Sequence, residues 1–222
     1  MKNIIIVNFK TYKEATGDNA LNLAKICDKV AIETESDIFV APQFTDIFRI
    51  FSETNIPIFG QHVDNIDYGS NTGHVLPESV KESGAIGCLV NHSERRLKLA
   101  DMEAIIGRLR KLDMASIVCT NNVNTTKAVA AMDPDFVAIE PPELIGSGIS
   151  VSTAQPEIIS GSVDAVEKIN PDLKVLCGAG ISSGEDVKKA IELGACGVLV
   201  ASGIVKAEDP KTALFDLVSG LK

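Results

Sequence analysis

The sequence predicts an α/β fold, a single (β/α)8 barrel domain that spans residues 1–222. Short apolar runs rich in Val and Ile recur along the chain, each followed by a segment with helical spacing of apolar residues. The runs lack polar alternation, which is typical of parallel strands covered by helices. About eight such units follow one another without a linker rich in Ser, Pro or Gly, so we expect one closed barrel.

The expected strands are, in chain order, residues 3–8, 37–42, 56–61, 86–91, 115–120, 135–140, 173–178 and 196–201. Amphipathic segments, with apolar residues at intervals of three and four, lie at residues 19–33, 102–112, 124–132, 185–193 and 210–218. A doubly wound open sheet is the alternative fold, but no G-x-G-x-x-G motif follows the first strand.

Composition excludes several classes of partner. The 222 residues are 45% hydrophobic and carry a net charge of -9, which argues against a nucleic-acid partner. The longest apolar stretches are far shorter than the roughly 20 residues of a membrane helix, and the first residues do not read as a signal peptide. We therefore expect no membrane partner and a cytoplasmic location.

The cysteines and histidines give no sign of a metal or cofactor. No cysteine pair has C-x-x-C spacing, so we expect small reduced core residues, with a disulfide framework or thiol catalysis as the alternatives. The three histidines lack metal-ligand spacing, so we expect no metal and no cofactor. The cysteines are Cys27, Cys88, Cys119, Cys177 and Cys196, and the histidines are His62, His74 and His92.

Polar side chains stand at the carboxyl ends of several expected strands, where barrel enzymes build their sites. They are Asn8, Lys10, Asn91, His92, Thr120 and Glu140. Because strand side chains alternate, Asn8 and Lys10 should point the same way and Phe9 to the opposite face.

The stretch NHSERR places His92 directly after a strand. Ser93 is a good N-cap for a helix that opens at Glu94. Free N–H groups at that helix end disfavour an imidazolium, so the ring should be neutral and able to donate or accept a proton. A structural histidine bonded to the backbone is the alternative.

The stretch EPPELIGSG resembles a hinged lid. Glu140 ends a strand, two prolines stiffen the exit, and residues 146–148 supply flexible joints. Between them, Leu144 and Ile145 form an apolar tip that could expel water over a polar ligand. An ordinary turn with an exposed glutamate is the alternative.

Two late turns are rich in small residues that allow close approach of the backbone. Their N–H groups could face an anion, and barrel enzymes often bind phosphate after the last two strands. Tight turns alone are the alternative, and the lack of G-K-[ST] argues against a nucleoside triphosphate. The residues are Gly178, Gly180, Ala201, Ser202 and Gly203.

Three of these motifs resemble the triosephosphate isomerase family and appear in the family's order. VNFK resembles its first-strand Asn-aromatic-Lys, NHSERR its G-H-S-E-R-R with Asn91 in place of Gly, and IEPPELIGSG its Y-E-P-x-x-x-I-G-T-G lid. The resemblance covers essentially the whole chain and implies a TIM barrel. The shortened middle is similar to compact archaeal members, which form tetramers, so a homotetramer is implied.

The resemblance implies interconversion of dihydroxyacetone phosphate and D-glyceraldehyde 3-phosphate through an enediolate, in glycolysis and gluconeogenesis. Glu140 would move the proton between carbons and His92 between oxygens, while Lys10 and Asn8 would stabilise negative charge. The implied substrate and phosphate contacts are Asn8, Phe9, Lys10, Ile145, Gly146, Gly180, Ala201 and Ser202.

The resemblance also implies roles that depart from the family pattern. Glu94 would either bond near Lys10 and His92 or act only as a first-turn acid. A loop of the neighbouring subunit would bring Thr72 to the site, although His74 stands where an acid is usual. Glu143 and Cys177 replace an aromatic residue and a tyrosine of the lid region, so the lid must latch differently.

Two other classes of function remain open from the residues alone. Another phosphate-binding barrel enzyme, an aldolase or a synthase, would share the late turns. It would not need Asn8, Lys10, His92 and Glu140 together, and no middle strand ends in a Schiff-base lysine. A non-catalytic protein that binds a phosphorylated metabolite is the second alternative, and it would bind without turnover.

Overall fold

A computed structural model describes residues 3–146 and 148–222. Each of the eight expected runs contains a strand: β1 (Ile4–Asn8), β2 (Asp37–Ala41), β3 (Phe59–Gly60), β4 (Gly87–Val90), β5 (Ala115–Thr120), β6 (Phe136–Ile139), β7 (Lys174–Gly178) and β8 (Gly197–Val200). The predicted strands are therefore confirmed in number and order. The third is much shorter than residues 56–61.

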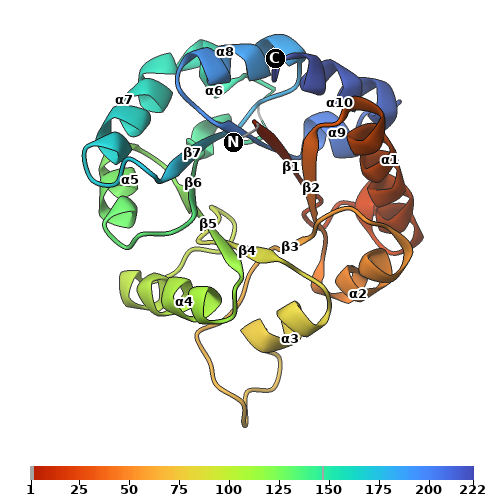
Figure 1. Ribbon diagram of the computed structural model, residues 1–222, viewed down its shortest axis with the longest axis vertical. Coiled ribbons are helices and arrows are strands. Elements are labelled where there is room, and N and C mark those ends of the chain that lie inside the picture. Colours follow the sequence, from red (N-terminus) through yellow and green to blue (C-terminus); the bar gives the residue numbers. More distant parts are fainter. Residues whose placement is uncertain (1–2, 147) are drawn as a thin grey trace.

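The strands form one parallel ring (Figure 1). Hydrogen-bonded neighbours run in the order β2-β1-β8-β7-β6-β5-β4-β3. A parallel bridge between Val40 and Ile58 joins the two ends, and the Val40 N–H donates to the Pro57 carbonyl at 3.1 Å. Pro57 has no N–H to return, which limits the ladder at this seam. The predicted barrel is confirmed, and its weakest seam lies between β2 and β3.

Helices surround the ring (Figure 1). They are α1 (Asp18–Thr34), α2 (Phe44–Glu53), α3 (Pro77–Glu82), α4 (Leu99–Lys111), α5 (Val123–Ala130), α6 (Val151–Ala154), α7 (Pro156–Glu167), α8 (Gly184–Glu192), α9 (Ser202–Val205) and α10 (Pro210–Ser219). Two 3-10 turns lie at Lys13–Ala15 and Pro142–Leu144. The five predicted amphipathic segments correspond to α1, α4, α5, α8 and α10.

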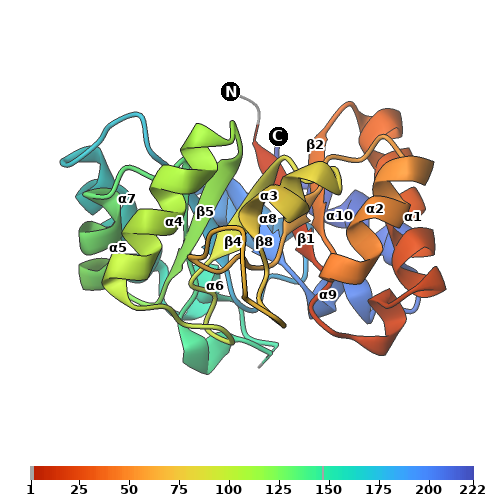
Figure 2. The same cartoon turned by 90° about the horizontal axis from the view of Figure 1, so that it is seen from below.

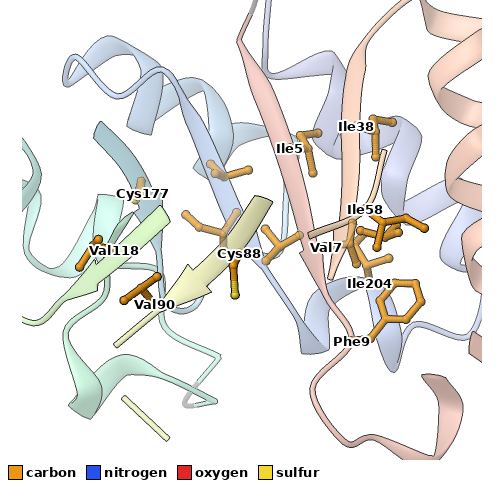
Figure 3. Close-up of a cluster of buried hydrophobic side chains, with 14 of the residues drawn as sticks. Ile5, Val7, Phe9, Ile38, Ile58, Cys88, Val90, Val118, Cys177 and Ile204 are labelled. Atoms are coloured by element: carbon orange, nitrogen blue, oxygen red, sulfur yellow. The ribbon is translucent and has the colours of Figure 1, made fainter. Parts of the chain in front are cut away.

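The core has two layers because side chains alternate along each strand. Ile4 and Ile6 belong to the cluster made by the inward faces of the strands. Ile5, Val7 and Phe9 belong to the larger cluster between strands and helices, where Figure 3 shows Phe9 beyond Val7 on the same side of β1. This register sends every second residue of β1 into the barrel.

The connection from β3 to α3 projects from the barrel as a long loop, at the bottom of Figure 1. We call its residues 65–74 the finger. Figure 2 shows both chain ends at one end of the barrel and α6 at the other. Within the residues that the structure describes, no helix is long and apolar enough to cross a membrane.

Candidate active site

The exit of β1 holds Lys10 in a fixed, left-handed conformation. The Lys10 N–H donates to Asn8 Oδ1 at 3.0 Å, and the φ of Lys10 is 48°. Gln61 Nε2 donates to the carbonyls of Lys10 and Ala41, both at 2.9 Å. A side chain from the β3 exit therefore clamps this turn, and only 10% of the Lys10 side chain is exposed.

The exit of β4 explains why asparagine can stand where the family pattern has glycine. Asn91 has a φ of 61°, a region that asparagine tolerates better than most residues. Its Oδ1 accepts from the Leu97 N–H at 2.8 Å, and its Nδ2 donates to the Cys119 carbonyl at 3.0 Å. Asn91 thus supplies both the turn and two hydrogen bonds that secure it.

His92 is buried, but the expected helix at Glu94 is wrong. The stretch after His92 makes only a turn, in which the Arg95 N–H donates to the His92 carbonyl at 2.7 Å, and α4 begins at Leu99. A local bond holds the ring instead: the Glu94 N–H donates to His92 Nδ1 at 3.2 Å. An amide N–H is a fixed donor, so Nδ1 accepts and the ring proton lies on Nε2.

Glu140 follows β6 and is only 6% exposed. Its N–H donates to the Thr120 carbonyl at 2.8 Å, which extends the β5–β6 ladder to Glu140. Glu140 Oε2 is buried, has no hydrogen-bond partner among the described residues, and lies 3.5 Å from His92 Nε2. Gly178 makes room for the side chain, because a Cβ there would stand 2.5 Å from Glu140 Cγ.

The charge of Glu140 affects the pKa of two nearby thiols. Burial raises the pKa of Cys119, and the Glu140 carboxylate, to which the thiol hydrogen-bonds, raises it further. Burial also raises the pKa of Cys177, with a smaller contribution from Glu140. Both thiols are therefore protonated near neutral pH. All five cysteines are free, and four of them are buried, as predicted.

Glu94 links the two exits. Lys10 Nζ donates to Glu94 Oε1 at 3.0 Å, and Glu94 Oε2 lies 3.4 Å from His92 Nδ1. The Glu94 side chain is 58% exposed, while Lys10 and His92 are largely buried. This geometry favours a role beside Lys10 and His92 over that of a first-turn acid, since no helix begins at Glu94.

A cavity of about 230 Å³ opens beside Glu140. Its wall includes the strand-end side chains Asn8, Lys10 and Glu140. The rest of the wall is rich in small residues and includes Ile145, Gly146, Gly148, Ala179, Gly180, Ala201, Ser202 and Gly203. The structure therefore brings the lid and both late turns onto one cavity with the strand-end side chains.

Three glycines of this wall have positive φ angles: 73° at Gly146, 75° at Gly148 and 73° at Gly180. Ser147, the middle of the predicted flexible joint, lies outside the described residues. A Cβ on Gly180 would stand 1.8 Å from the Ile149 carbonyl oxygen. The end of the lid thus packs directly on the turn after β7.

A second cavity, of about 500 Å³, adjoins the first, because Asn8, Lys10 and Tyr12 line both. His92 and Glu94 form part of its wall. The rest comes mostly from residues that the sequence did not assign to the site, among them Tyr12, Phe44, Gln61, His62 and Asp64. Nothing in their spacing marks them, since the β3 exit and α2 meet the site only after the ring closes.

Two predicted site residues lie away from the cavities. The Phe9 side chain is fully buried between β1 and the helices, so only its backbone can face a ligand. Thr72 is exposed and lines neither cavity, although the next residue of its turn, Gly73, lines the second cavity of the same chain. Within residues 3–146 and 148–222, no group of three or more His, Cys, Asp or Glu could hold a metal ion.

A barrel whose strand ends place a carboxylate and an ammonium on one cavity, with an imidazole 3.5 Å from the carboxylate, defines a (β/α)8-barrel enzyme. A family model described as Triosephosphate isomerase matches residues 3–220. The chain therefore belongs to the triosephosphate isomerase family, and it is an isomerase.

Individual relatives agree with this assignment. The chain is 58% identical over 216 residues to the triosephosphate isomerase of Methanothermobacter thermautotrophicus, covering 97% of this chain and 94% of that protein. It is 55% identical over 215 residues to that of Methanocaldococcus jannaschii, covering 97% and 98%. The triosephosphate isomerase structure from Bartonella henselae is 19% identical with a TM-score of 0.77, covers 98% and 99%, and shows the fold alone.

Proposed function

We propose that this chain interconverts dihydroxyacetone phosphate and D-glyceraldehyde 3-phosphate, with Glu140 as the base. The observation that carries the proposal is Glu140 Oε2, which is buried beside the cavity without a hydrogen-bond partner among the described residues and lies 3.5 Å from His92 Nε2. Because Oε2 is buried beside the cavity and has no partner among the described residues, it is free to accept a proton from a substrate carbon. Glu140 takes a proton from one substrate carbon and returns it to the next.

His92 moves the second proton. With Nδ1 occupied by the Glu94 N–H, the ring presents Nε2–H to the cavity and can exchange a proton between the two oxygens of the enediolate. The triosephosphate isomerase family is itself the standard example of this pairing of a glutamate base with a neutral histidine. Lys10 and Asn8 stabilise the negative charge that develops on the same oxygens.

The backbone wall holds the phosphate. Residues 201–203 open the first turn of α9, where N–H groups have no acceptor within the helix. Together with the N–H groups of Gly180 and Gly146, they would face the phosphate from the lid and the two late turns, whereas the Ile145 N–H already donates to the Pro142 carbonyl at 3.2 Å. In a chain of net charge -9, Lys10 adds the local positive charge that a dianion requires.

The lid excludes water from this reaction. Leu144 is buried and Ile145 lines the cavity, so the tip presents an apolar surface next to the base. When the lid is closed, water is excluded and the electrostatic contacts inside the cavity become stronger. The enediolate is then protected from side reactions such as loss of its phosphate.

We also propose that the enzyme is a homo-oligomer, a homotetramer, in which the finger of one subunit docks beside the second cavity of another. The exposed Thr-Gly turn and the open cavity beside Lys10, His92 and Glu94 support this. Sedimentation at micromolar concentration tests it, and an active monomer would contradict it.

The proposed setting is glycolysis and gluconeogenesis in the cytoplasm. Five free cysteines suit a reducing compartment. Fractionation of the native host with an antibody to this chain tests the location, and recovery with secreted or membrane fractions would contradict it.

A coupled assay tests the reaction. Dihydroxyacetone phosphate is supplied, and the glyceraldehyde 3-phosphate formed is oxidised by an added dehydrogenase whose NADH is followed. We expect saturable turnover in both directions. Binding of a triose phosphate without turnover would instead identify a non-catalytic binding protein.

A further inference from the structure

The finger has an exposed tip built around a tight turn. The His74 N–H donates to the Asn71 carbonyl at 3.1 Å, and this bond spans Thr72 and Gly73. Gly73 has a φ of 86°, which the third position of a type II turn requires. Near the other flank, Tyr68 is 74% exposed. The tip therefore has a defined shape, but the turn by itself does not set the direction in which the finger points.

The base of the finger is closed by a pair of bonds between Asp64 and Val75. The Asp64 N–H donates to the Val75 carbonyl at 2.9 Å, and the Val75 N–H donates to Asp64 Oδ2 at 2.7 Å. His62 Nε2 lies 3.0 Å from Asp64 Oδ1, and Arg95 adds an ion pair at 3.6 Å. This clasp joins the two ends of the finger at its base, so the direction of the finger depends on contacts farther along the loop.

A guanidinium on α4 supplies the missing restraint. Arg108 Nε and Nη2 lie 2.9 Å and 2.8 Å from Glu78 Oε1 at the start of α3, and Arg108 Nη1 bonds Asp67 Oδ1 on the finger. The Arg108 side chain is 21% exposed, and the bond to Asp67 leads the causes that raise its pKa. Asn65 adds a longer bond, 3.3 Å, to Asp101 on the same helix.

Asp67 passes this restraint to the tip. Its side chain is held by Arg108, and its carbonyl accepts from Asn71 Nδ2 at 2.7 Å. Asn71 is also the first residue of the turn that carries Thr72. A continuous chain of bonds therefore runs from a barrel helix through Asp67 to the Thr-Gly turn.

We propose that Arg108 is a positioning residue: by holding Asp67 it sets the direction of the finger, so that the Thr72 turn can dock at the site of a second copy. This inference rests on the proposed function, in which that turn completes a neighbouring site. Arginine suits the task because its planar fork reaches two carboxylates at fixed angles, which the point charge of lysine does not.

The expected consequence is on association rather than on folding. An exposed ion pair such as that of Asp67, whose side chain is 89% exposed, contributes little to fold stability. A finger that swings is competent to dock for only a fraction of the time, and the apparent dissociation constant rises by the inverse of that fraction. When each of two copies docks its finger on the other, the factor applies once for each finger, so the apparent dissociation constant rises by its square.

The experiment compares Arg108→Met, which removes the charge and keeps most of the apolar stem, with Arg110→Met as a matched control. Arg110 lies on the same helix but pairs with Asp133, away from the finger. Sedimentation and specific activity are followed over a dilution series from micromolar to nanomolar chain. We expect the dissociation midpoint of Arg108→Met to rise about tenfold, with activity recovered on concentration, and that of Arg110→Met to stay at the parent value.

Asp67→Asn tests the finger side of the same ion pair and leaves the barrel helix α4 unchanged. It should shift the midpoint as Arg108→Met does without lowering the melting temperature, and the double variant should shift it no further. An unchanged midpoint for Arg108→Met overturns the inference, as does an equal shift for Arg110→Met or no shift for Asp67→Asn. Sedimentation does not depend on turnover, so a parent protein that assembles but does not isomerise triose phosphates would refute the reaction and leave this test intact.

Discussion

The strand ends at the mouth of the barrel contribute two different kinds of group. The strands β1, β4 and β6 end in the side chains of Lys10, His92 and Glu140, and we call these strand ends the first side of the site. The strands β7 and β8, which lie between β6 and β1 in the ring, end in turns where Gly180 and Ser202 line the first cavity, and we call these turns the second side. The first side offers groups that carry charge or protons, and the second offers N–H groups.

The difference follows from what each task requires. Moving a proton requires an ionisable group at a fixed place, and only particular side chains supply one. Holding an anion requires only N–H donors, which nearly every residue has, provided that the backbone can come close enough. A substitution on the first side should therefore act through chemical identity, and one on the second side through shape.

The largest effect is expected for Glu140→Gln. The amide keeps the size of the side chain but cannot accept the substrate proton, so kcat should fall at least ~10²-fold, as general-base losses do. The coupled isomerase assay measures it. Glu157→Gln, an exposed change of the same kind at the start of α7, serves as the control. Near-normal kcat for Glu140→Gln would end its assignment as the base.

Lys10→Met should produce the next largest effect, on binding as well as on turnover. It removes the ammonium that lines both cavities, and loss of a charged hydrogen bond weakens affinity by roughly 10- to 100-fold. Calorimetric titration with a phosphate-bearing inhibitor measures it. Lys206→Met, near the same mouth but above the Tyr12 ring, should bind the inhibitor as the parent does. Equal affinity for Lys10→Met would show that backbone donors alone hold the phosphate.

Gly180→Ala tests the backbone side through shape. The new methyl would meet the Ile149 carbonyl at 1.8 Å on a residue with φ of 73°, so the turn or the lid must move. We expect KM to rise about tenfold, since a left-handed alanine alone costs ~1–2 kcal/mol. Gly107→Ala, in open space on α4, should leave KM unchanged and raise the melting temperature. An unchanged KM for Gly180→Ala would place the phosphate elsewhere.

The same contrast explains how much of the fold can be predicted from the sequence alone. All eight strands are visible as apolar runs, but β3 shrinks because the seam at Pro57 allows only a single bridge to β2. The helical spacing of apolar residues in α2 is hard to recognise in the sequence, because the apolar residues Phe48 and Phe51 are exposed on what would be its polar face. The helix α7 contains Gly161 between two serines, which lowers its helix propensity.

In the site, the sequence predicts the identity of the side chains better than it predicts the contacts that hold them in place. Lys10, His92 and Glu140 stand out by residue type at strand ends, and the structure brings them together. The sequence predicts a helix end beside His92, but the structure has only a turn there, and the N–H of Glu94 holds the ring through Nδ1. Gln61 leaves no signal at all, because its bonds to the carbonyls of Lys10 and Ala41 exist only once β1, β2 and β3 are neighbours.

The smallest effect is expected for Ser202→Ala, and it is the sharpest test of the comparison. This residue lines the phosphate cavity as the first residue of α9, where its N–H lacks an acceptor within the helix. Alanine keeps that N–H and is a better helix former, so KM should rise by no more than about threefold. If KM instead rises as much as in Gly180→Ala, the hydroxyl itself binds the substrate. The second side of the cavity would then use side-chain identity as the first side does.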